Sequence, residues 1–474
     1  MFVILFLASK TKHKVLQQDG VFKYFQLEDF LLKEGWDFSA LEVTDEIDPE
    51  GKFSRFKPPF QYKIGEKKFF VFPYAWTVLN YLQYKYLGFY GLFLVPFLGG
   101  ILSLYFFYKL LKAFDVHENI LSYSLLFYIF CTPLLIYSNW YYEATLCSFL
   151  LYFSMWAIFQ RKNLYTFLAG LSLGSIFFLR SEILIFAYLF LGFLFFANSV
   201  YRRQILLVGI LSFSIVLFSF YLNKLVYGTY SPLRSLDMAN YDIEDRVLAL
   251  LKYLVLEHYS IFIYSPFLYL SFWIVKEKYR SKKSFLLEEI SLFLASWLFI
   301  FFLPLLAPNQ QGIDFTPRYF FPVIPILGYL SFRVLEIKNF FNKNWLAYLV
   351  IFYSFLFILA MSFLVVYSNK LVDRHIELIL KESKNFNILV HNFPNYTYLT
   401  DRKIKYFRID NGQELHKLIS FFQEKKIQEE IVLFKLRDSA LDWKHLPFQK
   451  VNQDAGLEVF KLSLSEQAKS YNGK

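Results

Sequence analysis

Residues 164–196 read LYTFLAGLSLGSIFFLRSEILIFAYLFLGFLFF, two apolar blocks that are interrupted only by a polar turn around Arg180 and Glu182. Each block is close to the roughly 20 residues that a helix needs to cross the ~30 Å hydrocarbon layer of a bilayer. Comparable blocks recur at about residues 87–108, 120–137, 144–159, 164–180, 183–200, 204–226, 259–275, 285–306, 319–335 and 345–367. The sequence therefore predicts an all-helical polytopic membrane protein.

A further span is only partly present at the start of the chain. The stretch MFVILFLAS (residues 1–9) would form about 14 Å of helix, which is too short to cross a bilayer. It also lacks the basic start and the small-residue cleavage site of a signal peptide. We therefore expect about 11 transmembrane helices, with a first one that either is truncated and continues upstream or is short and tilted.

The composition excludes several other classes of protein. Of 474 residues, 56% are hydrophobic and only 19% are charged, whereas soluble domains carry roughly 25% charged residues. This apolar content excludes a disordered chain, and 18 Gly with 15 Pro exclude a collagen-like one. Cys131 and Cys147 both lie in apolar blocks, which favours small core residues over a disulfide framework or a thiolate metal site.

The net charge of +11 is explained by the loops that flank the predicted spans. Basic residues fall on alternate loops, at Lys109, Lys112, Arg161, Lys162, Arg202, Arg203, the run KEKYRSKK (276–283), Lys338 and Lys343. Alternate loops share one side, and an excess of Lys and Arg marks the cytoplasmic side. No basic helix or zinc-ligand spacing is present in the sequence, so we do not expect nucleic acid as a partner.

The remaining segments fall on the opposite, outer side of the membrane. A first outer loop, residues 10–86, contains VFKYFQLEDFLLKEGW (21–36), in which most apolar residues share one helical face while Lys23 does not, as in a helix that lies on a membrane surface. A second interfacial stretch begins near residue 67. The membrane part would thus be residues 1–368, starting inside and ending outside.

From about residue 369 the composition becomes charged and amphipathic. The patterns predict helices over 370–384 and 412–426 and strands over 387–390, 405–409, 429–436 and 457–463. We therefore expect residues 369–474 to form a small extracytoplasmic α/β domain.

Familiar catalytic motifs give little support to other enzymes. The pattern G-x-S-x-G is present at residues 170–174, but a hydrolase nucleophile elbow needs a strand that turns into a helix. Here the pattern lies inside an apolar span, where small residues let helices pack closely. The sequence contains no Walker loop, no G-x-G-x-x-G after a strand and no H-E-x-x-H, and its seven histidines are scattered, so no metal site is predicted from them.

Three acidic residues near the outer ends of spans are candidates for chemistry, because a carboxylate at bilayer depth costs roughly 2.5–3.5 kcal/mol on insertion scales. Each has a structural alternative. Asp19 with Gly20 could form a turn, Glu143 could be solvated in a turn, and Glu182 could pair with Arg180.

Arg318 follows Pro317 at the expected start of a helix. Its guanidinium could hold a phosphate in a bidentate manner. The alternative is an anchoring residue that reaches lipid headgroups.

The order of several short motifs resembles the C-type superfamily of integral-membrane glycosyltransferases, which includes protein O-mannosyltransferases and aminoarabinose lipid A transferases. The likeness is greatest to members of that superfamily in spirochaetes. The motifs are Gln18-Asp19-Gly20, RFKPPF (55–60), KFFVFPYAW (68–76), SNWYYE (138–143), FLRSE (178–182) and TPRYFFPVIPIL (316–327). In that superfamily an acid of the first outer loop is the catalytic base, which implies this role for Asp19, and Glu143 matches the acid of the second loop.

This resemblance implies an inverting enzyme of the cytoplasmic membrane that builds cell-envelope glycans. It would move a sugar from a polyprenyl-phosphate donor, seated among membrane lipids, to a hydroxyl of a glycan, lipid or protein acceptor at the outer face. Asp19 and Glu143 are the predicted catalytic residues, and the predicted substrate-binding residues are Arg318, Tyr319, Arg180, Glu182, Arg55 and Lys57. Two or three scattered carboxylates do not establish a cofactor, so a divalent metal is left open.

Two other functions remain compatible with the sequence. A transporter or flippase of lipid-linked sugars would usually carry charged residues near the middle of its spans, and the span centres here have almost none. A catalytically inactive envelope-assembly protein would keep the same fold and the same general sequence pattern.

Overall fold

The fold was analysed in a computed structural model. It describes residues 19–33, 36–41, 60–233, 241–256, 260–280, 285–306, 318–337, 345–383, 388–391, 405–409, 411–425, 430–436, 449–454 and 457–463, with single positions or short runs at 16, 47–48, 52–54, 56 and 427. The chain divides into two compact units, which are described separately. The bundle unit contains residues 72–364, and the sheet unit combines residues 7–71 with residues 365–474. The predicted first span, residues 1–9, lies outside the described residues.

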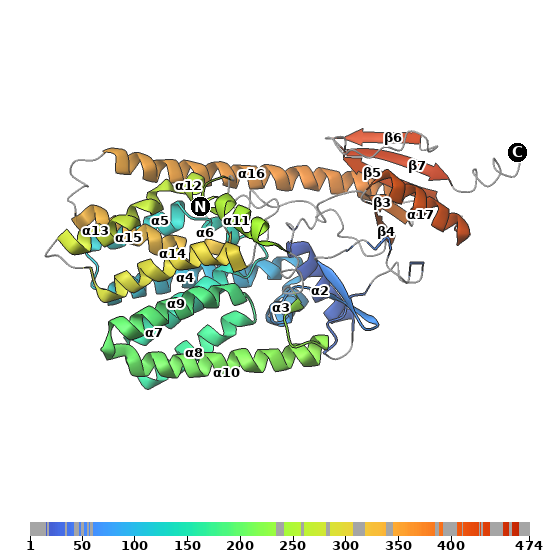
Figure 1. Cartoon of the computed structure of the whole chain (residues 1–474). Helices are drawn as coiled ribbons and strands as arrows, with labels where there is room; N and C mark the ends of the chain where they lie inside the picture. The colour runs from blue at the N-terminus through green and yellow to red at the C-terminus, as the bar shows by residue number, and fades with distance from the viewer. Residues whose placement is uncertain are drawn as a thin grey trace, which may run out of the picture. The chain divides into compact units, whose positions relative to one another are not determined.

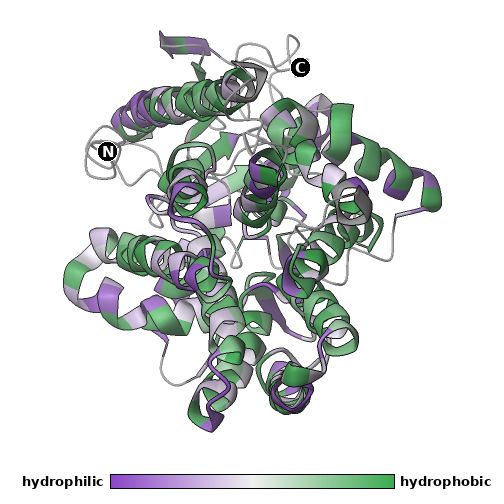
Figure 2. Ribbon diagram, turned by 90° about the vertical axis from the view of Figure 1, so that its left-hand side faces the viewer, coloured by the Kyte–Doolittle hydropathy of each residue, from purple (hydrophilic) through white to green (hydrophobic). Residues whose placement is uncertain are grey.

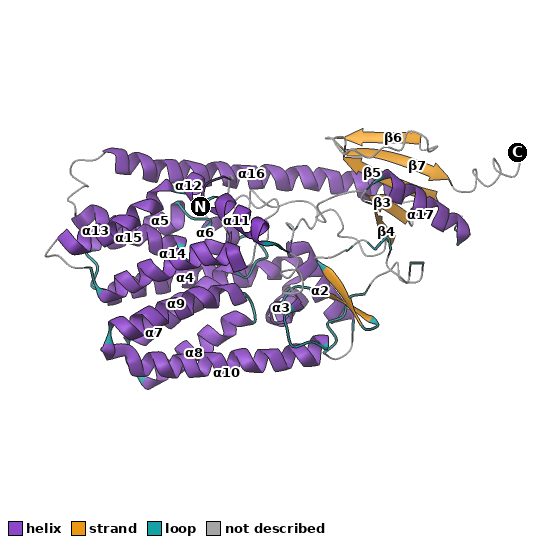
Figure 3. Cartoon of the chain, in the orientation of Figure 1, coloured by secondary structure: helices purple, strands orange, loops and turns teal. Residues whose placement is uncertain are grey.

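The bundle unit is helical throughout its described part (Figures 1 and 3). Its elements are α3 (Tyr74–Leu87), η1 (Gly88–Phe93), α4 (Leu94–Ala113), α5 (Glu118–Phe130), α6 (Leu134–Tyr137), α7 (Ala144–Phe159), α8 (Asn163–Phe177), α9 (Ser181–Ala197), η2 (Ser199–Tyr201), α10 (Arg202–Tyr227), α11 (Ile243–Leu251), η4 (Lys252–Leu256), α12 (Ile261–Tyr264), η5 (Pro266–Phe272), α13 (Trp273–Arg280), α14 (Leu287–Leu306), η6 (Arg318–Phe320), α15 (Ile324–Ile337) and the part of α16 (Trp345–Ser383) up to residue 364. Every predicted apolar block of residues 87–367 coincides with one or more of these helices.

Four helical segments of the described chain are long and apolar enough to cross a membrane, namely Tyr74–Ala113, Ser199–Tyr227, Leu287–Leu306 and Ile351–Glu382. Ala144–Phe159, Asn163–Phe177, Ser181–Ala197 and Pro266–Lys276 are shorter apolar helices. Hydrophobic residues cover most of the length of these helices (Figure 2). The start of the first of these segments differs from the prediction. It begins at Tyr74 and is 40 residues long, so it includes residues 74–86, which we expected to belong to the first outer loop.

Small residues bring neighbouring helices of the bundle close together. A Cβ atom added to Gly170 would lie 2.8 Å from Leu211, and one added to Gly174 would lie 2.7 Å from Ile215. Both glycines are on α8 and both partners are on α10. The G-x-S-x-G pattern is therefore a helix-packing seam, as the sequence indicated, because only glycine leaves room for such an approach.

The basic loops meet at one end of the bundle. The ring of Phe159, where α7 ends, lies 5.2 Å from that of Phe114 after α4 and 5.1 Å from that of Tyr201 before α10. The guanidinium of Arg161 lies 5.4 Å from the Tyr201 ring centre. We call this the basic end of the bundle unit; it carries Lys109, Lys112, Arg161, Lys162, Arg202 and Arg203. The predicted clustering of these residues on one side is thus confirmed.

The sheet unit contains a mixed five-stranded sheet with the strand order β4-β3-β5-β7-β6. Its elements are α2 (Asp19–Leu32), β1 (Gln61–Ile64), β2 (Lys67–Phe70), β3 (Ile388–His391), β4 (Lys405–Arg408), α17 (Gly412–Glu424), β5 (Glu430–Leu436), β6 (Gln449–Asp454) and β7 (Leu457–Ser463). Strand β3 is parallel to β4 and β5, whereas β7 is antiparallel to β5 and β6. The predicted strands and helix of this region are confirmed, and β6 was not predicted.

The sheet unit also includes part of the first predicted outer loop. Phe53 belongs to the hydrophobic core formed with the C-terminal strands and α17. Its carbonyl accepts the Arg408 N–H at 3.1 Å, and Ser54 forms an antiparallel bridge with Phe407. Residues 7–71 and 365–474 thus form one compact unit, and the division of the chain at residue 368 stays a prediction.

The expected surface helix is α2, but it is more deeply buried than the sequence indicated. Lys23, which we placed off the apolar face, is only 2% exposed, and Gln26 and Asp29 are buried as well. Phe22 and Phe25 pack against an aromatic cluster of Phe56, Phe60 and Phe70. The helix itself is confirmed, but the expected exposure of Lys23 is wrong, because tertiary packing covers this residue. Its location at a membrane surface stays a prediction.

Asp37 fixes the loop after α2. Its carboxylate accepts the Ser39 backbone N–H at 2.9 Å and Lys67 Nζ at 3.1 Å. Partial burial by itself would raise the pKa of Asp37, but these hydrogen bonds and nearby Lys33 lower it to about 2. Since this pKa lies below the ordinary value, Asp37 stabilises the unit above pH ~4 and that contribution is lost as the pH falls toward 2.

We predict that Phe53→Ala destabilises the sheet unit of the full-length protein by about 3–5 kcal/mol, the usual cost of truncating a buried aromatic residue. Hydrogen–deuterium exchange at the amides of β4 should become faster. The matched control is Trp36→Ala, because Trp36 is aromatic, lies in the same unit and is 73% exposed. Equal protection of β4 in both variants would show that Phe53 is not part of the folded core.

Candidate functional site

Two charged residues occupy the positions immediately before two apolar helices of the bundle. Glu143 is the N-cap of α7, and Arg180 is the N-cap of α9, where its backbone is extended. Because α7 ends and α8 begins at the basic end, Glu143 and Arg180 lie at the opposite end of the bundle. We call this the site end.

Glu143 and Arg180 form a buried ion pair. Arg180 Nε donates to Glu143 Oε1 at 3.1 Å, and Glu182 Oε1 lies 3.7 Å from the same nitrogen. Glu143 is 1% exposed and Arg180 is 2% exposed. The alternative of a solvated Glu143 is therefore wrong, whereas the alternative of a local Arg180–Glu182 contact is present in the structure.

Arg318 and Tyr319 join the same cluster. They lie on η6, after Pro317 and before α15. Arg318 Nη2 donates to the Tyr319 hydroxyl at 3.2 Å. The Tyr319 ring centre lies 5.0 Å from the Arg318 guanidinium and 5.3 Å from that of Arg180, so that one aromatic ring contacts both cations.

The burial of Arg318 argues against a role as a surface anchor. Arg318 is only 5% exposed, whereas an anchoring arginine must reach the lipid headgroups. The structure therefore collects Glu143, Arg180, Glu182, Arg318 and Tyr319, five of the residues that the sequence singled out, into one cluster of the bundle unit.

The electrostatics of this cluster keep Arg180 charged. Burial alone would lower the pKa of Arg180, but the carboxylates of Glu182 and Glu143 raise it above its ordinary value despite the neighbouring Arg318. Arg180 Nη2 is buried and has no hydrogen-bond partner in the part of the chain that the structure describes. An unpaired donor on a buried cation is costly, and such a group is explained most directly by a polar ligand or ordered water.

Trp76 and Tyr141 also carry buried polar groups without a hydrogen-bond partner among the described residues. Trp76 on α3 and Tyr141 just before Glu143 have ring centres 5.5 Å apart. The Trp76 indole N–H and the Tyr141 hydroxyl are both buried without hydrogen-bond partners among the described residues. Sequence reasoning missed both as site residues, although each belongs to a motif that carried the family resemblance.

The other predicted site residues are not part of this cluster as described. Asp19 begins α2 in the sheet unit and is buried there. Arg55 and Lys57 lie outside the described residues. Within the described ranges, no group of three or more His, Cys, Asp or Glu side chains could hold a metal ion.

The fold is similar to that of solved structures of ArnT and of an oligosaccharyltransferase. ArnT from Cupriavidus metallidurans superposes on this chain with a TM-score of 0.58 at 12% identity in its apo state, and the match covers 98% of this chain and 96% of ArnT. ArnT bound to undecaprenyl phosphate gives a TM-score of 0.57 at 11% identity, over 97% of this chain and 96% of ArnT.

An oligosaccharyltransferase from Archaeoglobus fulgidus, in a complex with zinc and sulfate, is similar as well. Its TM-score is 0.54 at 14% identity, over 91% of this chain and 67% of that protein. No protein-family model matches the sequence, and no curated protein sequence matches it. The predicted resemblance to the C-type fold is confirmed, and the particular likeness to spirochaete members stays a prediction.

We predict that Arg180→Met and Glu143→Gln each lower the stability of the bundle by about 3–5 kcal/mol, because each removes the nearest opposite charge from a buried ionic group. The double variant should lose less than the sum of the two, since neither charge is then left alone. Thermal unfolding in detergent, followed by tryptophan fluorescence, measures all three.

Arg203→Met is the control for this cycle, because Arg203 is an exposed cation at the basic end and its loss should change stability little. Strictly additive effects of the Arg180 and Glu143 substitutions would contradict an energetically coupled pair.

Proposed function

We propose that this protein is a membrane glycosyltransferase that moves a sugar from a polyprenyl-phosphate donor to an acceptor hydroxyl. The observation that carries the proposal is the buried cluster of Arg180, Glu143, Arg318 and Tyr319 at one end of a C-type bundle. Buried charges inside a membrane bundle are expensive and usually mark a substrate site. The ArnT structure with undecaprenyl phosphate supports a donor of this chemical class.

The two arginines suit the phosphate of the donor. The buried Nη2 of Arg180 has no acceptor among the described residues. The Arg318 guanidinium is close to Arg180, because both groups contact the ring of Tyr319. Fixed cations stabilise the negative charge that develops on a leaving phosphate, and they act most strongly where water is excluded. Glu143 is then a positioning residue that holds Arg180 in its orientation, and it is the reserve candidate for the base.

Asp19 is proposed as the base. The acceptor oxygen attacks the anomeric carbon while the bond from that carbon to the phosphate oxygen breaks, and its electron pair leaves with the phosphate. The proton of the acceptor hydroxyl passes to the Asp19 carboxylate, and the single displacement inverts the anomeric centre. Binding of the remaining donor groups would involve Glu182, Arg55 and Lys57.

The orientation in the membrane follows from the charges of the bundle. The basic end would face the cytoplasm, and the site end would then lie on the outer side of the cytoplasmic membrane. Residues 369–474 are proposed to lie on that side as well. Polyprenyl-linked donors and membrane lipids would be the partners at that surface, and the acceptor would be an envelope glycan, lipid or protein.

We predict that Asp19→Asn leaves expression and membrane insertion unchanged but removes the product. Loss of a general base lowers a rate by about 10²–10⁴-fold, which mass spectrometry of surface glycans, in cells with and without this chain, would record as absence of product. Arg318→Lys should retain more product than Arg318→Ala, because a point charge still attracts phosphate without the planar fork.

Glu66→Gln is the control, because Glu66 is an exposed carboxylate in the same unit. A transporter would respond most to changes within its spans, and an inactive assembly protein would respond to neither substitution. Full product from a stably expressed Asp19→Asn protein would exclude Asp19 as the base and leave Glu143 as the candidate.

A second prediction concerns topology, and it is tested with single cysteines in the background of buried Cys131 and Cys147. A membrane-impermeant maleimide should label cysteines at positions Tyr230 and His416 in intact cells. Tyr230 follows α10 at the site end, and His416 lies on α17 of the C-terminal domain, and both regions are proposed to be outside. A cysteine at Arg203 should react only after the membrane is broken. Labelling of Arg203 alone in intact cells would reverse the orientation.

A further inference from the structure

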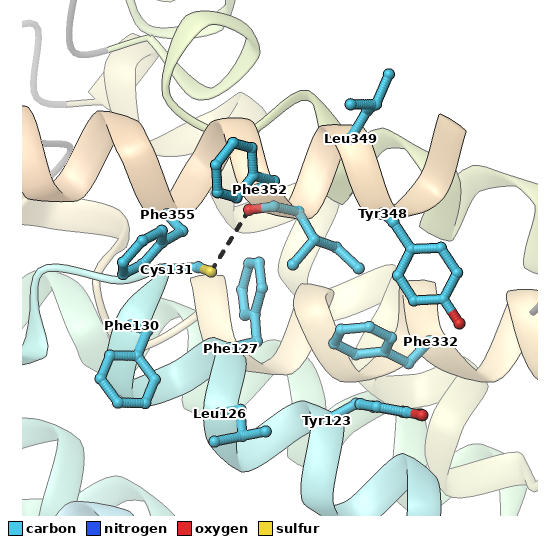
Figure 4. Close-up of a pocket in the computed structure, with 11 residues that line it drawn as sticks. Tyr123, Leu126, Phe127, Phe130, Cys131, Phe332, Tyr348, Leu349, Phe352 and Phe355 are labelled. Carbon is cyan, nitrogen blue, oxygen red and sulfur yellow. Dashed lines mark hydrogen bonds between the residues drawn. The ribbon is translucent and has the colours of Figure 1, made fainter. Parts of the chain in front are cut away.

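The bundle unit contains an apolar pocket that the proposed chemistry does not use. It has a volume of about 880 Å³ and lies among α5, α15 and α16 (Figure 4). This volume is within the range of about 300–1,000 Å³ that is usual for small-molecule sites. Its lining is Tyr123, Leu126, Phe127, Phe130, Cys131, Phe332, Tyr348, Leu349, Ile351, Phe352 and Phe355.

The pocket has a buried floor and an exposed rim. Phe127, Cys131 and Phe332 on the floor are almost fully buried, whereas Leu126 and Leu349 on the rim are 50% and 48% exposed. All three lining elements are helices of the membrane bundle, so the open side of the pocket faces the hydrocarbon layer. An apolar groove in that position is filled by hydrocarbon rather than by water.

The two ends of the pocket differ. Figure 4 shows the hydroxyl groups of Tyr123 and Tyr348 at one end, and these residues lie within the first two turns of α5 and α16. Tyrosine is favoured at the level of lipid headgroups, where one side of the ring is apolar and the hydroxyl is wet. This end is the basic end of the bundle, because α5 follows the loop that joins it to α4.

The other end of the pocket is lined by Phe130, Cys131 and Phe355 (Figure 4). Cys131 Sγ donates to the Ile351 carbonyl at 3.8 Å, and the Tyr264 hydroxyl donates to the Cys131 carbonyl at 2.9 Å. These bonds hold Cys131 in place in the lining. A chain that enters beside the tyrosines would therefore reach Phe130, Cys131 and Phe355.

The length of the pocket and the basic residues at its end of the bundle identify its occupant. From Tyr348 to Phe355 the lining of α16 rises about 10 Å, which is within one leaflet of a ~30 Å hydrocarbon layer. Lys109 and Lys112 lie at the same end of the bundle, where cations attract anionic headgroups. We propose that the pocket holds an acyl chain of an anionic phospholipid from the leaflet at the basic end.

The polyprenyl tail of the donor fits this pocket less well. Its phosphate would lie at the site end, beside Arg180 and Arg318, whereas the tyrosine hydroxyls that mark the headgroup level of the pocket lie at the basic end. The proposal is therefore independent of the proposed transferase activity, and it assigns the pocket to a resident lipid rather than to the substrate.

The test uses the full-length protein in phosphatidylcholine nanodiscs that contain a phosphatidylglycerol with a diazirine at the terminal carbon of one acyl chain. After irradiation, mass spectrometry should find the label on Phe130, Cys131 or Phe355, at the end of the pocket opposite the two tyrosines. A second arm replaces this probe with a polyprenyl phosphate that carries the diazirine on its last isoprene unit, and it should leave these residues unlabelled.

Leu126→Trp combined with Leu349→Trp fills the rim and should abolish the phosphatidylglycerol label. The control is Leu206→Trp with Leu217→Trp on α10, where both leucines are exposed to a similar extent, and it should keep the label. Thermal unfolding verifies that both variants are folded. Label spread equally over α5, α10 and α16 in the wild-type protein, or labelling of the pocket by the polyprenyl probe instead, would overturn the proposal without affecting the activity test.

Discussion

The constraint on which this structure depends is that a backbone in hydrocarbon must satisfy its own hydrogen bonds. Helices do so internally, but every interruption leaves carbonyl groups to be paired. Buried tyrosines on neighbouring helices supply the donors. The hydroxyls of Tyr152, Tyr227 and Tyr264 donate to the carbonyls of Pro322, Phe72 and Cys131 at 2.6, 3.2 and 2.9 Å, and each carbonyl lies at or beyond a helix end. The 36 tyrosines of this chain thus do more than fill an apolar core.

One of these bonds connects the constraint to the candidate site. Pro322 lies between η6, which carries Arg318, and α15, and its carbonyl is held by Tyr152 of α7. The same helix α7 begins directly after Glu143, which binds Arg180. A single helix therefore fixes both the irregular segment with one cation and the carboxylate that orients the other. Side chains held in this way need little reorganisation when a charged ligand binds.

The sequence predicted the helices of the bundle because long apolar blocks are compatible with few other structures. It predicted β3, β4, β5 and β7 because their apolar residues are bounded by turn signals. It missed β6, since QKVNQD (449–454) has almost no apolar pattern and is specified by pairing with β7. The helix expected over 370–384 proved to be the end of α16, which is continuous from Trp345 to Ser383. Composition changes along that helix while its backbone does not.

Long-range contacts set the limit for the rest. The packing of Phe53 against the C-terminal sheet joins segments that are hundreds of residues apart, and no local pattern encodes it. At the site, the motifs identified Glu143, Arg180 and Arg318 individually, whereas the choice of Glu143 as the partner of Arg180 depends on how α7 and α9 pack. Spacing along the chain could suggest only Glu182, two residues away, as the partner of Arg180.

A second buried cluster shows why incomplete pairing is the informative feature. At the basic end, Glu289 Oε1 accepts Arg333 Nε at 2.8 Å and also the Tyr329 hydroxyl, while Oε2 accepts the Leu286 N–H at 2.8 Å. Both oxygens of that carboxylate are satisfied, as expected of a group that only connects α14 to α15. Arg180 is equally buried and also ion-paired, yet its Nη2 has no partner among the described residues. Because both clusters contain a buried glutamate, an arginine and a tyrosine, the unpaired donor, rather than the presence of buried charge, is what distinguishes the candidate site from a structural clamp.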